Sequence, residues 1–200
     1  MDNLIQKKQQ LITKLEEEKT AVINEAITKG LNPDAPMKDS GIDWLGKVPT
    51  HWALSKIAYV TNVVRGASPR PAGDPKYFNG SHTPWITVAE VTKDGSKFIT
   101  DVSSYLTEDG KSQSRFIQSG TLVLSNSGAT LGVPKILKID GCINDGSVAF
   151  LNIADNIKQE FLYYFLKSLT YTYREMMKGS GQPNLNTDIV KSTNLAIPPV

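Results

Sequence analysis

The sequence predicts an α+β fold: a long N-terminal helix of the coiled-coil type, followed by a mixed α/β domain with a twisted sheet and one packed helix. Three patterns predict it. Apolar side chains recur at helical spacing over residues 4–28, short apolar runs alternate with turn residues over 53–154, and helical spacing returns over 156–178. The 200 residues, 40% of them hydrophobic and 21% charged, provide enough apolar surface for a buried core.

The N-terminal segment is predicted to form one helix of about seven turns. Its apolar stripe includes Leu4, Leu11, Leu15 and Val22, and five lysines balance five acidic residues on the other faces. The segment therefore has no net charge with which to attract phosphates. Gly30 ends the helix. A stripe this narrow needs a partner surface, which is either the helix's own domain or another helix.

A linker is expected over residues 31–52, because this stretch is rich in proline and glycine. It carries Trp44 and Trp52, whose indole rings bury large areas, so we expect the linker to lie against the globular part. His51, beside the second tryptophan, is expected to be a structural histidine.

The region from 53 to 154 is predicted to form the sheet. Its β-type runs are residues 56–64, 85–91, 120–125, 133–138 and 147–153. Turn-rich stretches between the runs form loops that can reach a ligand. These loops are residues 66–75, 93–95 and 125–128.

A second helix is expected over residues 156–178, ending at Gly179. Its apolar face is more typical of a protein core than of a stacking platform for bases. The residues of this face are Phe161, Leu162, Phe165, Leu166, Leu169, Tyr173 and Met176. A last strand is expected over 195–199, where prolines close it.

Composition and motifs exclude several kinds of site. Cys142 is the single cysteine, which rules out an intrachain disulfide and a cysteine zinc site and fits a reducing cytoplasm. With only His51 and His82, a multi-histidine metal site is not expected. The sequence has no phosphate loop, dinucleotide motif, nucleophile elbow or run of about 18 apolar residues. The net charge of +2 does not by itself indicate a nucleic-acid binder.

Particular residue runs are more informative. Around the linker they are residues 25–34, 37–46 and 48–52. In the domain they are Gly66-Ala67-Ser68-Pro69, Trp85-Ile86-Thr87, and residues 119–125, 179–182 and 196–199. Together these runs resemble the specificity (S) subunit of Type I restriction-modification systems, in which such a linker joins a conserved helix to a target recognition domain. The likeness covers nearly the whole chain, and the linker is its specific part.

The resemblance implies a plan for the domains. A complete family member has two recognition domains, held apart by two antiparallel helices, whereas this chain has one helix ahead of one domain and resembles a half subunit or a fragment. We expect residues 1–30 to form a helix for dimerisation and subunit docking, 31–52 a linker, and 53–200 the DNA target recognition domain. Two copies paired through residues 4–28 would restore two domains related by a two-fold axis.

The function implied by the resemblance is sequence-specific recognition of double-stranded DNA. Loop side chains would read base edges, while lysines and arginines would bind phosphates and set the register. The candidate DNA-binding residues are Arg65, Ser68, Arg70, Lys93, Lys97, Ser125, Asn126, Ser127, Lys178, Ser180, Gln182 and Asn184. The candidate subunit-interface residues are Leu4, Leu11, Leu15 and Val22.

The covalent chemistry is expected to lie in partner subunits. The Asn/Asp-Pro-Pro-aromatic tetrapeptide of adenine methyltransferases is absent, since Pro198 and Pro199 follow Ile197 and precede Val200. The resemblance implies a non-catalytic, cytoplasmic chain without metal or cofactor, with S-adenosylmethionine on modification subunits and ATP and Mg²⁺ on a restriction subunit.

Two other functions remain as alternatives. One is a non-catalytic coiled-coil adaptor whose α+β domain binds a protein partner, which the neutral helix and weak net charge favour. The other is a hydrolase that uses His51 or His82 with a serine, and it ranks last because no nucleophile–base spacing supports it.

Overall fold

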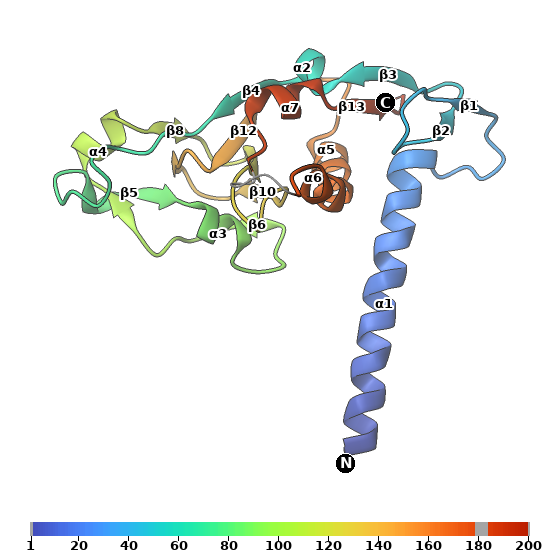
Figure 1. Ribbon diagram of the computed structural model, residues 1–200, viewed down its shortest axis with the longest axis horizontal. Coiled ribbons are helices and arrows are strands. Elements are labelled where there is room, and N and C mark those ends of the chain that lie inside the picture. The colour runs from blue at the N-terminus through green and yellow to red at the C-terminus, as the bar shows by residue number, and fades with distance from the viewer. Residues whose placement is uncertain (1, 179–183, 200) are drawn as a thin grey trace. The chain divides into compact units, whose positions relative to one another are not determined.

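The computed structural model describes residues 2–178 and 184–199 (Figure 1). It consists of two compact units, which are described separately below: residues 1–54 with 196–200, and residues 55–195. Among the described residues, no helix combines the length and the apolar character that crossing a membrane requires. Gly179, the expected end of the second helix, lies outside the described residues, as do the candidates Ser180 and Gln182.

The first unit contains the long helix α1, Asp2–Lys29, as the apolar spacing predicted. It ends where Gly30 adopts a φ of +81° and its N–H donates to the carbonyl of Ala26 at 3.1 Å. This left-handed cap is readily available only to glycine. The apolar stripe of α1 lies in solvent, so the helix has a face that no part of its own unit covers. A coiled-coil partner for that face stays a prediction.

The segment expected to be a linker is folded into a hairpin. Strands β1, Met37–Asp39, and β2, Lys47–Pro49, pair antiparallel. Lys38 donates its ammonium to the carbonyl of Trp52 at 2.7 Å, and the buried indole of Trp52 lies against Gly30 at the end of α1. His51, for which a structural role was expected, is exposed. Strands of three residues are too short to produce a periodic signal in the sequence, which is why they were missed.

Two sheets form most of the second unit. One has the strand order β4-β12-β9-β10-β6 and the other β7-β5-β11-β8. Within these two sheets, neighbouring strands run antiparallel except β10 with β6 and β11 with β5, which run parallel, so both sheets are mixed. The strand bounds are β4 Asn62–Arg65, β5 Phe78–Ile86, β6 Phe98–Ile99, β7 Tyr105–Leu106, β8 Arg115–Ile117, β9 Leu122–Ser125, β10 Pro134–Leu137, β11 Gly141–Ile143 and β12 Ser147–Leu151.

One apolar core joins these sheets. Strands β9 and β10 are buried along their whole length, and β12 is buried except at Leu151. The core cluster draws on strands of both sheets, so neither sheet is stable without the other. Its buried residues are Ile86, Val91, Ile99, Val102, Ile117, Val123, Leu137, Ile143 and Ala149.

Short helices connect and cover the strands. They are α2 Ile57–Val60, α3 Val88–Thr92, α4 Glu108–Ser112, α5 Gln159–Ser168, α6 Thr170–Met176 and α7 Thr187–Ser192. Helix α5 packs on β10 through the apolar face that the sequence predicted to be core. The terminal strand β13, Asn194–Ile197, pairs with β3, Ala53–Lys56.

Three expected elements differ from the structure. The strand expected over 56–64 is interrupted by α2, because Ile57 and Val60 are buried at helical spacing. The strand expected over 85–91 ends at Ile86, and α3 follows it. The helix expected over 156–178 is divided into α5 and α6 at Leu169. The N–H of Leu169 donates to the carbonyls of both Phe165 and Leu166, so the helix tightens at this residue. The other three expected strands match β9, β10 and β12 within two residues at each end.

Tyr173 on α6 yields a prediction about alkaline stability. Its hydroxyl lies 2.9 Å from that of Thr193, and burial raises its pKa to about 12. The unfolded chain ionises near pH 10, so Tyr173 contributes stability below that pH that is lost as pH rises toward 12. We expect the wild type to lose about 1 kcal/mol more than Tyr173→Phe between pH 9 and 11, measured by urea unfolding. Parallel loss in both proteins would contradict this.

Candidate nucleic-acid interface

The turn at residues 143–147 brings together two of the loops that the sequence marked as able to reach a ligand. Gly66 donates its N–H to Ser147 at 2.9 Å, and Ala67 donates to Ile143 at 3.1 Å. From the other loop, Asn126 donates its N–H to Gly146 at 2.9 Å. The turn itself was not singled out in the sequence, because nothing local distinguishes it from an ordinary strand connection.

Asp145, at the centre of this turn, holds the polar residues of the first loop. Ser68 donates its hydroxyl to Asp145 Oδ1 at 2.7 Å, and Arg70 Nη2 lies 3.2 Å from Oδ2. Arg65 donates Nε to the carbonyl of Asp145 at 2.7 Å, and Arg115 donates Nε to the carbonyl of Arg65 at 2.6 Å. These five residues are called the Asp145 cluster below. The structure thus unites the predicted Arg65, Ser68 and Arg70 and adds two residues that the sequence analysis missed.

Close backbone packing makes this arrangement possible. A Cβ on Gly66 would lie 2.1 Å from the carbonyl oxygen of Asn144 and 2.5 Å from that of Ile143. Such distances are far inside van der Waals contact, so only glycine lets the end of β4 approach the turn this closely.

The loop at 125–128 changes the list of candidates. Ser125 is fully buried, donating its hydroxyl to the carbonyl of Thr130 and accepting the N–H of Val133, each at 2.9 Å. Asn126 is fully buried too, and its side-chain amide has no hydrogen-bond partner among the described residues. Both side chains therefore face the interior and are not exposed to a ligand, and their assignment as DNA-binding residues stays a prediction.

Three further candidates lie at the surface. Ser127 is partly exposed and forms a β-bridge with exposed Asn184. Lys178 is exposed and pairs with Glu175 at 2.6 Å, and this carboxylate raises the pKa of the lysine. The tertiary fold thus brings Asn184 to the loop of Ser127, although 57 positions separate them in the sequence.

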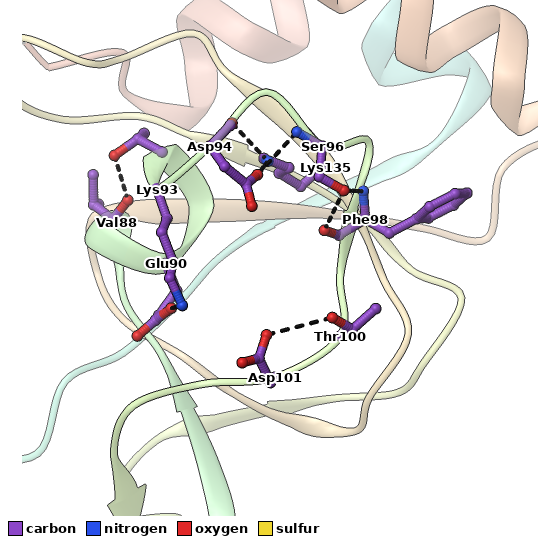
Figure 2. A network of polar contacts seen from close by, with 10 residues as sticks. Val88, Glu90, Lys93, Asp94, Ser96, Phe98, Thr100, Asp101 and Lys135 are labelled. Carbon is purple, nitrogen blue, oxygen red and sulfur yellow. Dashed lines mark hydrogen bonds and ion pairs between the residues drawn. The ribbon is translucent and has the colours of Figure 1, made fainter.

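A separate polar network holds the loop at residues 93–97 (Figure 2). Lys93 is exposed and lies 3.8 Å from Glu90 Oε2. Burial opposes ionisation of Glu90, but hydrogen bonds from the hydroxyl and backbone N–H of Ser103, together with the charge of Lys93, outweigh it and lower the pKa. Lys93 therefore stays available at the surface, anchored by a carboxylate beneath it.

Lys97 contacts three residues of helix α5. Its ammonium lies 3.7 Å from Glu160 and 5.0 Å and 5.2 Å from the ring centroids of Tyr163 and Tyr164, all on α5. Its side chain is only 22% exposed. These contacts include none of the other candidate residues. They indicate that Lys97 attaches the 93–97 loop to α5.

Lys135, on strand β10, holds the same loop through Asp94. Its side chain is 2% exposed, and its ammonium donates to the carboxylate of Asp94 at 2.6 Å and to the Asp94 carbonyl at 3.0 Å (Figure 2). The hydrogen bond from Lys135 is the main cause that lowers the pKa of Asp94, and the N–H of Ser96 adds to it. The loop is thus attached to the buried strand β10 by an ion pair that is exposed on one side only.

We expect the two halves of this pair to respond differently to mutation. Asp94→Ala leaves the buried ammonium without its carboxylate, whereas Lys135→Met fills similar space and lets the exposed carboxylate bind water. Lys135→Met is therefore expected to change the free energy of unfolding by no more than about 1 kcal/mol, and Asp94→Ala to lower the urea midpoint further. Because the folded pKa of Asp94 lies below its unfolded value of about 3.9, the difference between Asp94→Ala and wild type should shrink as pH falls below that value, and it should be lost only once pH is below the folded pKa. A larger loss for Lys135→Met would contradict this reasoning.

Other chemistry finds no support in the described part of the chain. No group of three or more His, Cys, Asp or Glu side chains is placed to hold a metal ion there. His51 and His82 are both exposed. Cys142 is a buried free thiol whose pKa is raised by burial, so it is poorly suited to act as a nucleophile.

Comparison with known proteins agrees with this picture. The family model described as "Type I restriction modification DNA specificity domain" matches residues 49–200. Among curated proteins, the Type I restriction enzyme MjaIX specificity subunit of Methanocaldococcus jannaschii is 28% identical over 160 residues, which cover 77% of this chain and 36% of that protein.

Solved structures share the fold. The HsdS subunit from Thermoanaerobacter tengcongensis superposes with a TM-score of 0.65 at 17% identity, covering 98% of this chain and 43% of that one. A chain from a study of complex assembly and conformational transition of the type I R-M system gives 0.63 at 18% identity, covering 99% and 45%. The S subunit from M. genitalium gives 0.51 at 17% identity, covering 74% and 34%. The chain therefore spans less than half the length of each of these relatives.

Proposed function

Because the chain belongs to the family of Type I restriction modification DNA specificity domains, we propose that it recognises a specific sequence of double-stranded DNA and directs partner methyltransferase and restriction subunits to it. The observation that carries the proposal is the Asp145 cluster. Three arginines and a serine, from two separate segments, meet at the turn of residues 143–147. Guanidinium and hydroxyl groups held in this way can donate hydrogen bonds to the acceptor atoms of base edges and phosphates.

Two of the remaining exposed candidates, Ser127 and Asn184, adjoin the same turn through the 125–128 loop. Lys93 and Lys178 are exposed as well, and we assign them to phosphate contacts. A net charge of only +2 then means that the basic groups must be concentrated locally to bind DNA, because the chain as a whole attracts phosphates weakly.

We assign the docking role to α1. Leu4, Leu11, Leu15 and Val22 form an exposed apolar stripe with spacings of seven, four and seven residues, which suits a second helix packed alongside. The proposed occupant is the corresponding helix of a second recognition unit, either another copy of this chain or a second half subunit. Modification subunits would then bind along the charged flanks of the helix pair.

The proposal places no chemistry in this chain. Methyl transfer with S-adenosylmethionine and ATP-driven work with Mg²⁺ are assigned to the partner subunits, and the buried thiol Cys142 is consistent with a reducing cytoplasm. A purified chain that methylates or cleaves DNA unaided would contradict this assignment.

The function is tested by comparing the methylated sites of cells with and without this chain, each expressing the cognate modification subunit. We expect one motif to be methylated only when the chain is present. Gel-shift binding to a duplex carrying that motif should weaken as salt rises, because bound phosphates release counterions. A protein that dimerises but binds no duplex at any salt concentration, with modification subunits present, would instead be the adaptor considered above.

A further inference from the structure

The chain uses arginine sparingly and places it unevenly. Of its 22 basic residues only four are arginines, at positions 65, 70, 115 and 174. Three of these four belong to the Asp145 cluster. Arginine differs from lysine in having a planar fork of donors that matches paired acceptors, so its concentration here points to recognition of a planar acceptor pair.

The geometry of two of these arginines supports this reading. Arg65 and Arg115 are exposed, and each is held through Nε by a backbone carbonyl, at 2.7 Å and 2.6 Å. Among the described residues, neither makes a hydrogen bond or ion pair through its Nη atoms. Holding Nε fixes the plane of the guanidinium and leaves both terminal donors for a ligand, so less conformational entropy is lost on binding.

The carboxylate of Asp145 favours a base edge over a phosphate as that ligand. Its side chain is 40% exposed, so the cluster offers a hydrogen-bond acceptor beside its donors, and the carboxylate offsets part of the positive charge that attracts a phosphate. The major-groove edge of a G·C pair has no net charge and combines two acceptors on guanine with an amino donor on cytosine. A group of guanidinium forks beside a carboxylate has the complementary donors and acceptor.

We propose that the Asp145 cluster reads a G·C base pair in the major groove, with Arg65 and Arg115 presenting their Nη atoms to guanine O6 and N7. Asp145 acts as the positioning residue: its carbonyl orients Arg65, and its carboxylate restrains Ser68 and Arg70. This inference rests on the proposed function and adds to it the identity of one base pair and of the residues that read it.

The test selects duplexes with a randomised core, using this chain together with its modification subunit, at several salt concentrations. The wild type is expected to select G·C at one or more fixed positions. Arg115→Lys and Arg65→Lys keep the charge but lose the fork, so the preference for guanine at such a position should fall about tenfold or more while the salt dependence stays unchanged. Arg174→Lys is the matched control, since this arginine bonds the Leu131 carbonyl outside the cluster and should leave the selected sequence unaltered.

Asp145→Asn separates positioning from simple loss of fold. Removing one negative charge from the cluster should strengthen binding to random duplex and steepen its salt dependence by about one phosphate equivalent, while weakening the preference for G·C. If Asp145 has only a structural role, Asp145→Asn should instead lower the thermal midpoint and weaken binding both to random duplex and to the selected sequence.

The outcomes distinguish the two proposals. A wild-type protein that binds no duplex defeats the proposed function itself. A wild type that selects a sequence without G·C at a cluster-dependent position, or lysine variants that weaken binding equally to all sequences, would overturn the G·C assignment and leave DNA recognition intact.

Discussion

Replacing Gly66 with alanine is expected to abolish sequence-specific DNA binding and to lower the free energy of unfolding by about 3 kcal/mol. The added methyl group would lie 2.1 Å from the Asn144 carbonyl oxygen, which is rigid backbone and cannot rotate away. The end of β4 must then separate from the turn, and this breaks the bonds that Gly66 and Ala67 make to Ser147 and Ile143.

The loss of function follows from the position of this glycine. Gly66 follows Arg65 directly and lies two residues before Ser68, so any displacement of its backbone also moves two members of the Asp145 cluster. Urea unfolding measures the stability. Gel-shift binding to a duplex that carries the motif identified from the methylated sites measures DNA binding. Gly95→Ala is the control, because a Cβ at Gly95 meets nothing within 4 Å. Specific binding that survives in Gly66→Ala would show that the DNA surface lies elsewhere.

The second large effect concerns α1. The double variant Leu11→Glu with Leu15→Glu is expected to convert the assembled protein to separate chains, because two charges would be placed in the apolar contact between helices. Leu11 and Leu15 are 57% and 53% exposed in the single chain, so the variant should leave the thermal midpoint of the recognition unit unchanged. Sedimentation with and without the modification subunit measures the assembly.

A charge-matched control is available on the same helix. Gln9→Glu with Thr13→Glu adds the same charges about half a turn away, on the face opposite the stripe. Assembly should persist in this control. If the leucine variant also remains assembled, the docking role of the stripe is wrong.

Helices and buried strands were predictable where one pattern extends over many residues. The spacing of Leu4, Leu11, Leu15 and Val22 predicts α1, and Gly30 marks its end, because both signals are local to the chain. The strands β9, β10 and β12 are short, mainly apolar runs bounded by turn residues, and they were predictable because this signal too is local. The hairpin of β1 and β2 was missed because strands of three residues contain too few positions to show a period.

The candidate site was predictable only in part. The loop with Arg65, Ser68 and Arg70 was found from its turn residues, but Ser125 and Asn126, in an equally polar loop, are buried. Polarity does not reveal burial, since a polar side chain can be satisfied by backbone groups such as those that bond Ser125.

By itself, the sequence determined the long helix α1, the buried strands β9, β10 and β12 and the family resemblance, because each depends on residue types at short spacings. Only the tertiary structure decided that Arg115 and Asp145 join Arg65, which lies 50 and 80 positions away along the chain. Contacts at such separations depend on how the strands pair. They also depend on whether the backbone can approach closely, as Gly66, which has no side chain, approaches the carbonyls of Ile143 and Asn144. Those conditions are properties of the folded chain and leave no pattern in any short stretch of sequence.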